Sequence, residues 1–144
     1  MLKKGGNAFD AAIATQWALA VVYPGAGNLG GGGFMVATGK GKDPIALDYR
    51  EMAPAAAFRD MYLDEDGNAN SEKSLYGHLS CGVPGTVAGL FASHQYAKLP
   101  MKDLLEPAIE LAEKGFAITE AEASSLNYNK ASFEKYNTVS PVFV

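Results

Sequence analysis

A run of four consecutive glycines, Gly30–Gly33, inside the glycine-rich segment Gly25–Gly33, constrains the fold more than any other feature of the sequence. Glycine loses more conformational entropy on folding than any other residue, so four in a row cost more than a turn requires. The segment is too rich in glycine for a helix or a regular strand. We therefore expect another chain segment or a ligand to lie directly against this backbone, and positive φ angles within the connection.

The segments on either side of the glycines have clear patterns. Asn7 is a good N-cap, and Asp10 stands where a capping box needs a carboxylate, so residues 7–22 are predicted to form a helix. This helix is apolar on every face, which is typical of a buried helix, and it is shorter than the roughly 20 residues that a bilayer span needs. We therefore expect no membrane span. Residues 34–38 and 45–50 predict an antiparallel hairpin.

The rest of the chain is mainly helical in pattern. We expect a short helix within residues 53–61, a turn at 64–68, and longer helices over 83–98, over 101–114 and from Thr119 onward. Gly115 is a good C-terminal stop, and Glu122 stands in capping-box position relative to Thr119.

Composition argues against several classes of protein. The 144 residues carry a formal net charge of −4, which disfavours binding of nucleic acid or of an anionic membrane surface. The single cysteine, Cys81, closes no intrachain disulfide, and we expect its thiol to be half-buried. His78 and His94 have no obvious set of ligands around them, so we expect neither a metal site nor a cofactor.

Three features of the sequence raise functional hypotheses. Gly25–Gly30 matches the pattern G-x-G-x-x-G, but its order of helix, turn and strand is wrong for a dinucleotide site, which needs strand, turn and helix. Thr86 is internal and lacks the α-amine that serves a threonine nucleophile as its base, so a place in the first turn of a helix fits it better. Arg50, at a strand end, is either a solvated surface residue or a fork that grips a carboxylate, and residue type alone favours the surface.

Four blocks of sequence, in order, carry a resemblance to a known family: Gly5–Ala12, Pro24 with Gly30–Phe34, Asp48–Pro54 and Gly82–Gly89. Through them the chain resembles the γ-glutamyltranspeptidase family of N-terminal-nucleophile hydrolases over nearly its whole length. The resemblance implies an α+β fold that is part of a four-layer αββα sandwich, incomplete in this chain. It also implies that residues 1–144 are a single partial domain, the front part of the large subunit.

The same resemblance implies an activity. Members of the family are proenzymes that cut themselves into a large and a small subunit, and the new N-terminal threonine of the small subunit is the nucleophile. It attacks the γ-glutamyl amide of glutathione or another γ-glutamyl compound, and the γ-glutamyl group then passes to an amino acid, a peptide or water. By this resemblance Arg50 would bind the α-carboxylate of the γ-glutamyl group. No catalytic residue is expected in this chain, which alone would be inactive.

Other expectations follow from the resemblance and from the strand count. The partners would be the small subunit and the γ-glutamyl compounds, and the location would be periplasmic or extracellular. The alternative is a non-catalytic binding or assembly module that retains the fold, and nucleotide binding by the glycines is a distant third. Because the strands are too few to cover the apolar helix, we expect exposed apolar surface at Phe34, Ile45 and Val142–Val144.

Overall fold

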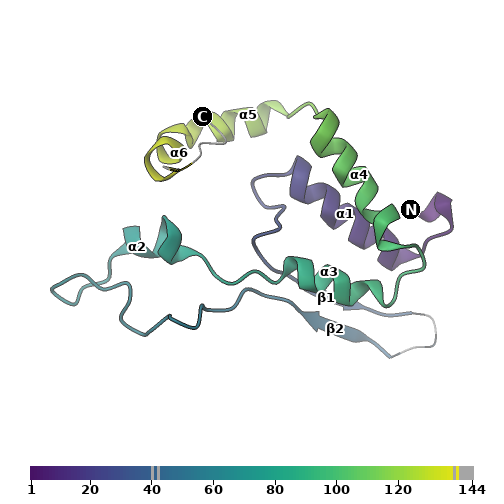
Figure 1. Ribbon diagram of the computed structural model, residues 1–144, viewed down its shortest axis with the longest axis horizontal. Coiled ribbons are helices and arrows are strands. Elements are labelled where there is room, and N and C mark those ends of the chain that lie inside the picture. The colour runs from purple at the N-terminus through teal and green to yellow at the C-terminus, as the bar shows by residue number, and fades with distance from the viewer. Residues whose placement is uncertain (40, 42, 138, 140–144) are drawn as a thin grey trace. The chain divides into compact units, whose positions relative to one another are not determined.

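The computed structural model describes residues 1–39, 41, 43–137 and 139. They divide into two units (Figure 1). Unit 1 holds Met1–Met52 and Val83–Ala117, and unit 2 holds Ala53–Gly82 and the described residues from Ile118 onward. Helices and a small sheet make the fold class α+β, as expected. That residues 1–144 form one partial domain stays a prediction.

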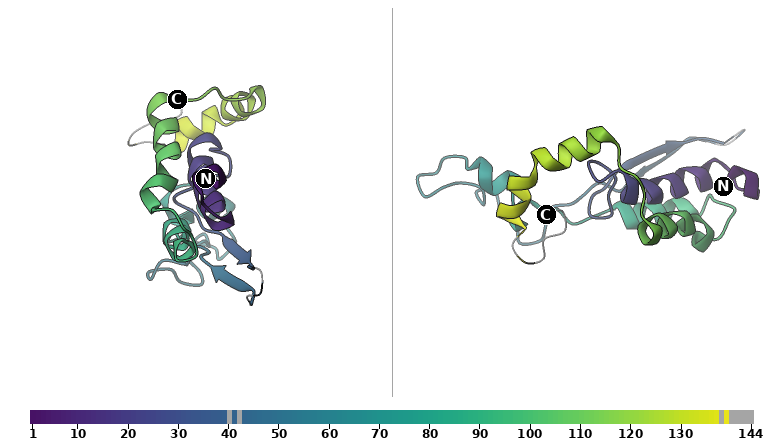
Figure 2. Two further views of the ribbon diagram at one scale, coloured as in Figure 1. Left: turned by 90° about the vertical axis from the view of Figure 1, so that its right-hand side faces the viewer. Right: turned by 90° about the horizontal axis from the view of Figure 1, so that it is seen from above.

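The core of unit 1 is made by three helices, α1 (Ala8–Val22), α3 (Thr86–His94) and α4 (Met101–Lys114). Figures 1 and 2 show α1 and α4 side by side, with α3 beside α1. The buried residues of these helices form one hydrophobic cluster: Ile13, Ala14, Trp17, Leu90, Leu104 and Ala108. Burial of each large side chain in this cluster stabilises the fold by about 1.5–3 kcal/mol. The bounds of α4 agree with the prediction, whereas α3 is shorter than the predicted 83–98.

The capping box predicted at the start of α1 is confirmed. The Asn7 side chain accepts hydrogen bonds from Phe9 N at 2.8 Å and Asp10 N at 3.2 Å, and the Asp10 carboxylate accepts one from Asn7 N at 2.6 Å. The helix is not buried on every face, because its described neighbours leave one stripe exposed, at Ala8, Ala12, Thr15 and Leu19. Leu19, on the uncovered side, is 41% exposed.

The only sheet among the described residues is the predicted antiparallel hairpin, formed by β1 (Phe34–Ala37) and β2 (Ile45–Asp48). Its register pairs Phe34 with Asp48 and Ala37 with Ile45. Phe34 is 64% exposed, as expected. Ile45 is half-buried, so that expectation was wrong. Side chains alternate along a strand, and Ile45 shares the half-buried face of β2 with Leu47. Val142–Val144 lie outside the described residues.

The α-helices described in unit 2 are short: α2 (Ser71–Leu75), α5 (Glu120–Tyr128) and α6 (Lys130–Tyr136), with a 3-10 helix, η2, at His78–Ser80. The capping box at Thr119 and the turn around Gly67, whose φ is 81°, are confirmed. The helix expected within residues 53–61 is absent, and this segment forms turns that are largely exposed. Short helices need tertiary packing to persist, and no described residue between Ala53 and Met61 is buried.

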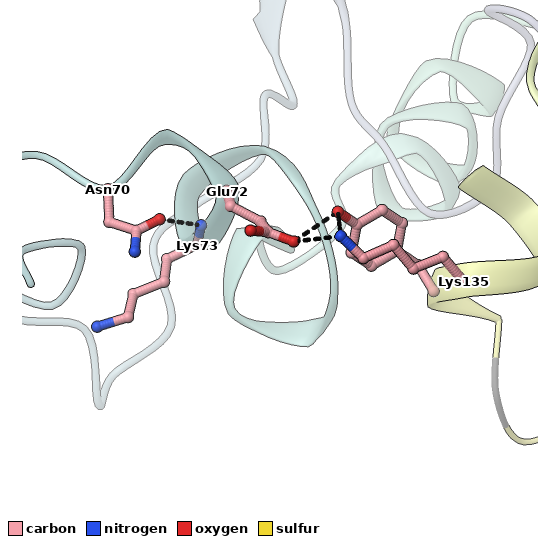
Figure 3. A network of polar contacts seen from close by, with 5 residues as sticks. Asn70, Glu72, Lys73 and Lys135 are labelled. Carbon is pink, nitrogen blue, oxygen red and sulfur yellow. Dashed lines mark hydrogen bonds and ion pairs between the residues drawn. The ribbon is translucent and has the colours of Figure 1, made fainter. Parts of the chain in front are cut away.

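A polar network joins α2 to α6 within unit 2 (Figure 3). Glu72 Oε1 accepts hydrogen bonds from Lys135 Nζ at 2.6 Å and from the Tyr136 hydroxyl at 2.8 Å, and the Tyr76 and Tyr136 rings stack 4.6 Å apart. Hydrogen bonds from Lys135 and Tyr136 lower the pKa of Glu72, and the bond to Glu72 raises the pKa of Lys135. Both charged side chains are exposed, so their ion pair holds α2 and α6 together only weakly.

None of the described helices has both the length and the apolar composition that crossing a bilayer requires.

Candidate functional site

Arg50, to which the resemblance assigns a role, is the second residue after the end of β2, in a segment held by two sets of backbone hydrogen bonds. On one side Tyr49 N donates to Gly33 O at 3.1 Å, and Gly33 N donates to Tyr49 O at 3.3 Å. On the other side Met52 N donates to Val83 O at 3.1 Å, and Val83 N donates to Met52 O at 2.8 Å. The backbone of Arg50 is therefore fixed before and after the residue.

The glycine run lies directly against this segment. A Cβ atom on Gly32 would lie 2.6 Å from Tyr49 O, and one on Gly33 would lie 2.8 Å from a carbon of the Tyr49 ring. Side chains at these positions would clash, so the close approach requires glycine. The expectation that something lies against the glycines is confirmed, and it is a chain segment. The positive φ angles expected in Gly25–Gly33 are not found, since none of these glycines has φ in that region.

The start of α3 docks onto the same run of glycines. Gly31 O accepts hydrogen bonds from Gly85 N at 2.9 Å and Thr86 N at 3.0 Å. The fully buried Thr86 hydroxyl donates to Asn28 Oδ1 at 2.5 Å, and Gly31 N donates to the same oxygen at 3.0 Å. Thr86 is thus the first residue of a helix, as predicted, and its hydroxyl connects α3 to the glycine-rich segment.

A cleft of about 340 Å³ lies between the end of β2 and α3. Its walls are mainly apolar, with Met52, Val83, Ala88 and Ala92 among the lining residues, and Arg50 lines it as well. The Arg50 side chain is exposed, and its guanidinium forms no ion pair with any residue that the structure describes. An arginine fork in this situation can bind a carboxylate through two parallel N–H donors.

Asp48, the last residue of β2, has a carboxylate with a local role. Asp48 Oδ1 accepts a hydrogen bond from Arg50 N at 3.0 Å, within the exposed turn of the chain. This bond fixes the direction in which the backbone leaves β2. The Asp48 carboxylate therefore orders the Arg50 backbone and is bonded to its N–H group.

The other candidates from the sequence do not form a site among the described residues. Cys81 is exposed rather than half-buried, because no described residue packs over it, and its Sγ contacts Gly77 O rather than His78. His94 Nε2 lies 2.8 Å from Leu99 O, a structural contact next to α4. No group of three or more potential ligand side chains that could hold a metal occurs in the described ranges.

Two residues that organise the site were missed by the sequence analysis, Asn28 and Tyr49. Tyr49 continues the register of the hairpin by one position and so faces Gly33. An aromatic residue opposite a glycine on a neighbouring strand is a known stabilising pair, and this pairing could have been found from the hairpin alignment. Asn28, three residues before Gly31, has the side chain typical of an Asx turn.

Solved structures place this architecture among the N-terminal-nucleophile hydrolases. The chain superposes on Helicobacter pylori gamma-glutamyltranspeptidase with a TM-score of 0.91 and 48% identity, over 94% of this chain and 39% of that one. A family model described as Gamma-glutamyltranspeptidase matches residues 1–144. The chain therefore belongs to the γ-glutamyltranspeptidase family.

Two curated relatives agree with this assignment. The glutathione hydrolase proenzyme of Escherichia coli is 53% identical over 127 residues, covering 88% of this chain and 22% of that protein. The glutathione hydrolase proenzyme of Pseudomonas aeruginosa is 50% identical over 143 residues, covering 94% of this chain and 26% of that protein. The chain thus spans only about a quarter of the length of these relatives.

Proposed function

We propose that this chain is part of a γ-glutamyl transferase or hydrolase, and that Arg50 binds the α-carboxylate of the γ-glutamyl substrate. The observation that carries the proposal is the exposed guanidinium of Arg50, on a backbone fixed at both ends, at an apolar cleft. Glutathione and related γ-glutamyl compounds carry a free α-carboxylate, which is the planar anion that such a fork matches.

In the complete enzyme, the γ-glutamyl amide is cleaved by the N-terminal threonine of a small subunit. The threonine hydroxyl attacks the amide carbonyl, the amine leaves, and the resulting γ-glutamyl ester is transferred to water, an amino acid or a peptide. Arg50 binds the α-carboxylate of the substrate, and this contact positions the γ-glutamyl amide next to the nucleophile. The relatives are named proenzymes, which supports self-cleavage of a precursor. The chain alone is inactive, and the enzyme is periplasmic or extracellular.

The test is the variant Arg50→Lys in the full-length protein that carries this chain. Lysine keeps the positive charge but loses the planar fork. Charge-assisted hydrogen bonds contribute about 1.5–3 kcal/mol each, so losing one raises KM for γ-glutamyl substrates by roughly 10- to 150-fold. The matched control is Arg59→Lys, since Arg59 is the only other arginine among these 144 residues and its side chain is 96% exposed.

An unchanged KM in Arg50→Lys would remove Arg50 from the substrate site. Sequencing the coding region after the codon for Val144 tests the enzyme assignment separately. We expect an open frame that leads to a Thr-Thr-His segment. A stop codon, with no neighbouring frame that supplies the threonine, would favour a non-catalytic binding or assembly module.

A further inference from the structure

The residue before Arg50 has an unusual environment in unit 1. The Tyr49 side chain is 8% exposed, and its ring lies against two glycines from distant parts of the chain. A Cβ atom on Gly33 would be 2.8 Å from the ring, and one on Gly89, in α3, would overlap it. The ring thus packs directly on bare backbone at both places, so its position is tightly restricted.

The polar atoms of Tyr49 are held in addition to its ring. Its hydroxyl lies 3.4 Å from Gln16 Oε1 in α1 and 3.5 Å from Phe34 O in β1. Its carbonyl accepts from Gly33 N, and a Cβ atom on Gly85 would overlap that carbonyl. Tyr49 is therefore the point at which α1, the glycine run and α3 meet.

The fixed position of Tyr49 also determines the direction of the Arg50 side chain, because the two residues are adjacent in the chain. Successive side chains in an extended segment point to opposite sides. With the Tyr49 ring packed into the interior, the next side chain must leave on the outer side, and Arg50 is indeed exposed. A shift or rotation of the Tyr49 backbone would move the guanidinium with it.

We propose that Tyr49 is the positioning residue for Arg50, an inference that rests on the proposed function. The Tyr49 ring, held by Gly33 and Gly89, determines where the Arg50 guanidinium meets the α-carboxylate of the substrate. A misplacement of about 1 Å in a binding group can reduce the rate by roughly 100-fold.

The experiment compares two substrates on the same preparation of the full-length enzyme. One is a γ-glutamyl anilide, and the other is the 4-aminobutanoyl anilide, which lacks only the α-carboxylate. The ratio of their kcat/KM values measures recognition of the carboxylate. This ratio does not depend on the fraction of enzyme that is folded and processed, so a merely structural role of Tyr49 would leave it unchanged.

Two variants change the contact between the Tyr49 ring and Gly89, one at each residue. Either variant tests whether Tyr49 positions Arg50, provided that it retains activity. Tyr49→Leu removes the ring, and Gly89→Ala places a methyl group where the ring lies. We expect each to lower the ratio at least about tenfold, mainly through KM of the γ-glutamyl substrate. Tyr49→Phe keeps the ring and loses only a hydroxyl whose two possible acceptors lie 3.4 Å and 3.5 Å away, so its ratio should stay within about twofold of wild type.

The controls match the type of substitution. Gly30→Ala adds a methyl group where no atom lies within 4 Å, and Tyr128→Leu removes a tyrosine that is 89% exposed. Both should leave the ratio unchanged. The variant Arg50→Ala tests the proposed function by itself, because it should abolish the preference for the carboxylate-bearing substrate.

The outcomes separate the two claims. If Arg50→Ala retains the preference, the proposed role of Arg50 fails. If Arg50→Ala loses it while Tyr49→Leu or Gly89→Ala retains it, Arg50 binds the carboxylate but Tyr49 does not position it, and the inference is overturned. Loss of the preference in Arg50→Ala and in every active variant of the pair Tyr49→Leu and Gly89→Ala, but not in Tyr49→Phe, supports the inference.

Discussion

Replacement of the buried Asp10 by asparagine should destabilise unit 1 severely, although the side chain keeps its shape. Asp10 is fully buried, and its carboxylate accepts hydrogen bonds from Asn7 N at 2.6 Å, Leu99 N at 2.8 Å and Lys98 N at 3.1 Å. It caps α1 and also holds the connection between α3 and α4. Burial raises the pKa of Asp10, but the N–H donors of Asn7, Leu99 and Lys98 outweigh this effect and lower the pKa.

The magnitude follows from these three donors. Asparagine has one acceptor oxygen, so at least one backbone N–H would face the amide NH₂ group and lose its partner. Hydrogen bonds to a charged group contribute about 1.5–3 kcal/mol and neutral ones about 0.5–1.5, a difference of about 1 kcal/mol for each donor. The easier burial of a neutral side chain offsets part of the loss. We expect Asp10→Asn to lower the free energy of unfolding by about 2–4 kcal/mol.

Trp17 supplies the assay, because it is the only tryptophan of the chain and its side chain is 6% exposed within the same core. Urea unfolding followed by its fluorescence should show a midpoint lowered by about 1–2 M, for slopes of about 2 kcal/mol per M. Glu122→Gln is the control, since it changes a capping carboxylate at an exposed helix start. A midpoint shift in Asp10→Asn no larger than in this control would refute the reasoning.

Three further outcomes are expected. The pKa of Asp10 in the folded protein is lowered from 3.8. Its contribution to stability is therefore complete above that value and is lost as the pH falls through the folded-state pKa. In urea titrations at acid pH, the difference in unfolding free energy between wild type and Asp10→Asn should become smaller. Leu104→Ala should cost about 2–5 kcal/mol by the same assay, and Ile109→Ala, half exposed on the same helix, much less. Cys81 should react fully with a thiol reagent in the native protein, and protection of the thiol would contradict its exposure.

The sequence predicted those elements whose determinants are local. The cap formed by Asn7 and Asp10, the cap at Thr119 and the stop at Gly115 each depend on residues within one turn of each other, and all three are present. The hairpin was predicted for the same reason, since its alternation and its loop lie within one short segment.

Local patterns failed where packing decided the outcome. The segment 53–61 has residues that suit a helix, but none of its described residues is buried, and it forms turns. Cys81 is exposed and Ile45 is half-buried, against expectation, because burial depends on which segments come to lie over a residue.

The site shows the same division. The family and the candidate residue Arg50 could be recognised without the structure, because the four motifs are defined by residue identity and order along the chain. The contacts of Tyr49 with Gly33 and Gly89, and of Asp10 with the N–H groups of Lys98 and Leu99, became visible only in the folded chain. These contacts join positions up to 89 residues apart, and no local pattern encodes them, because each depends on how separate segments pack against one another.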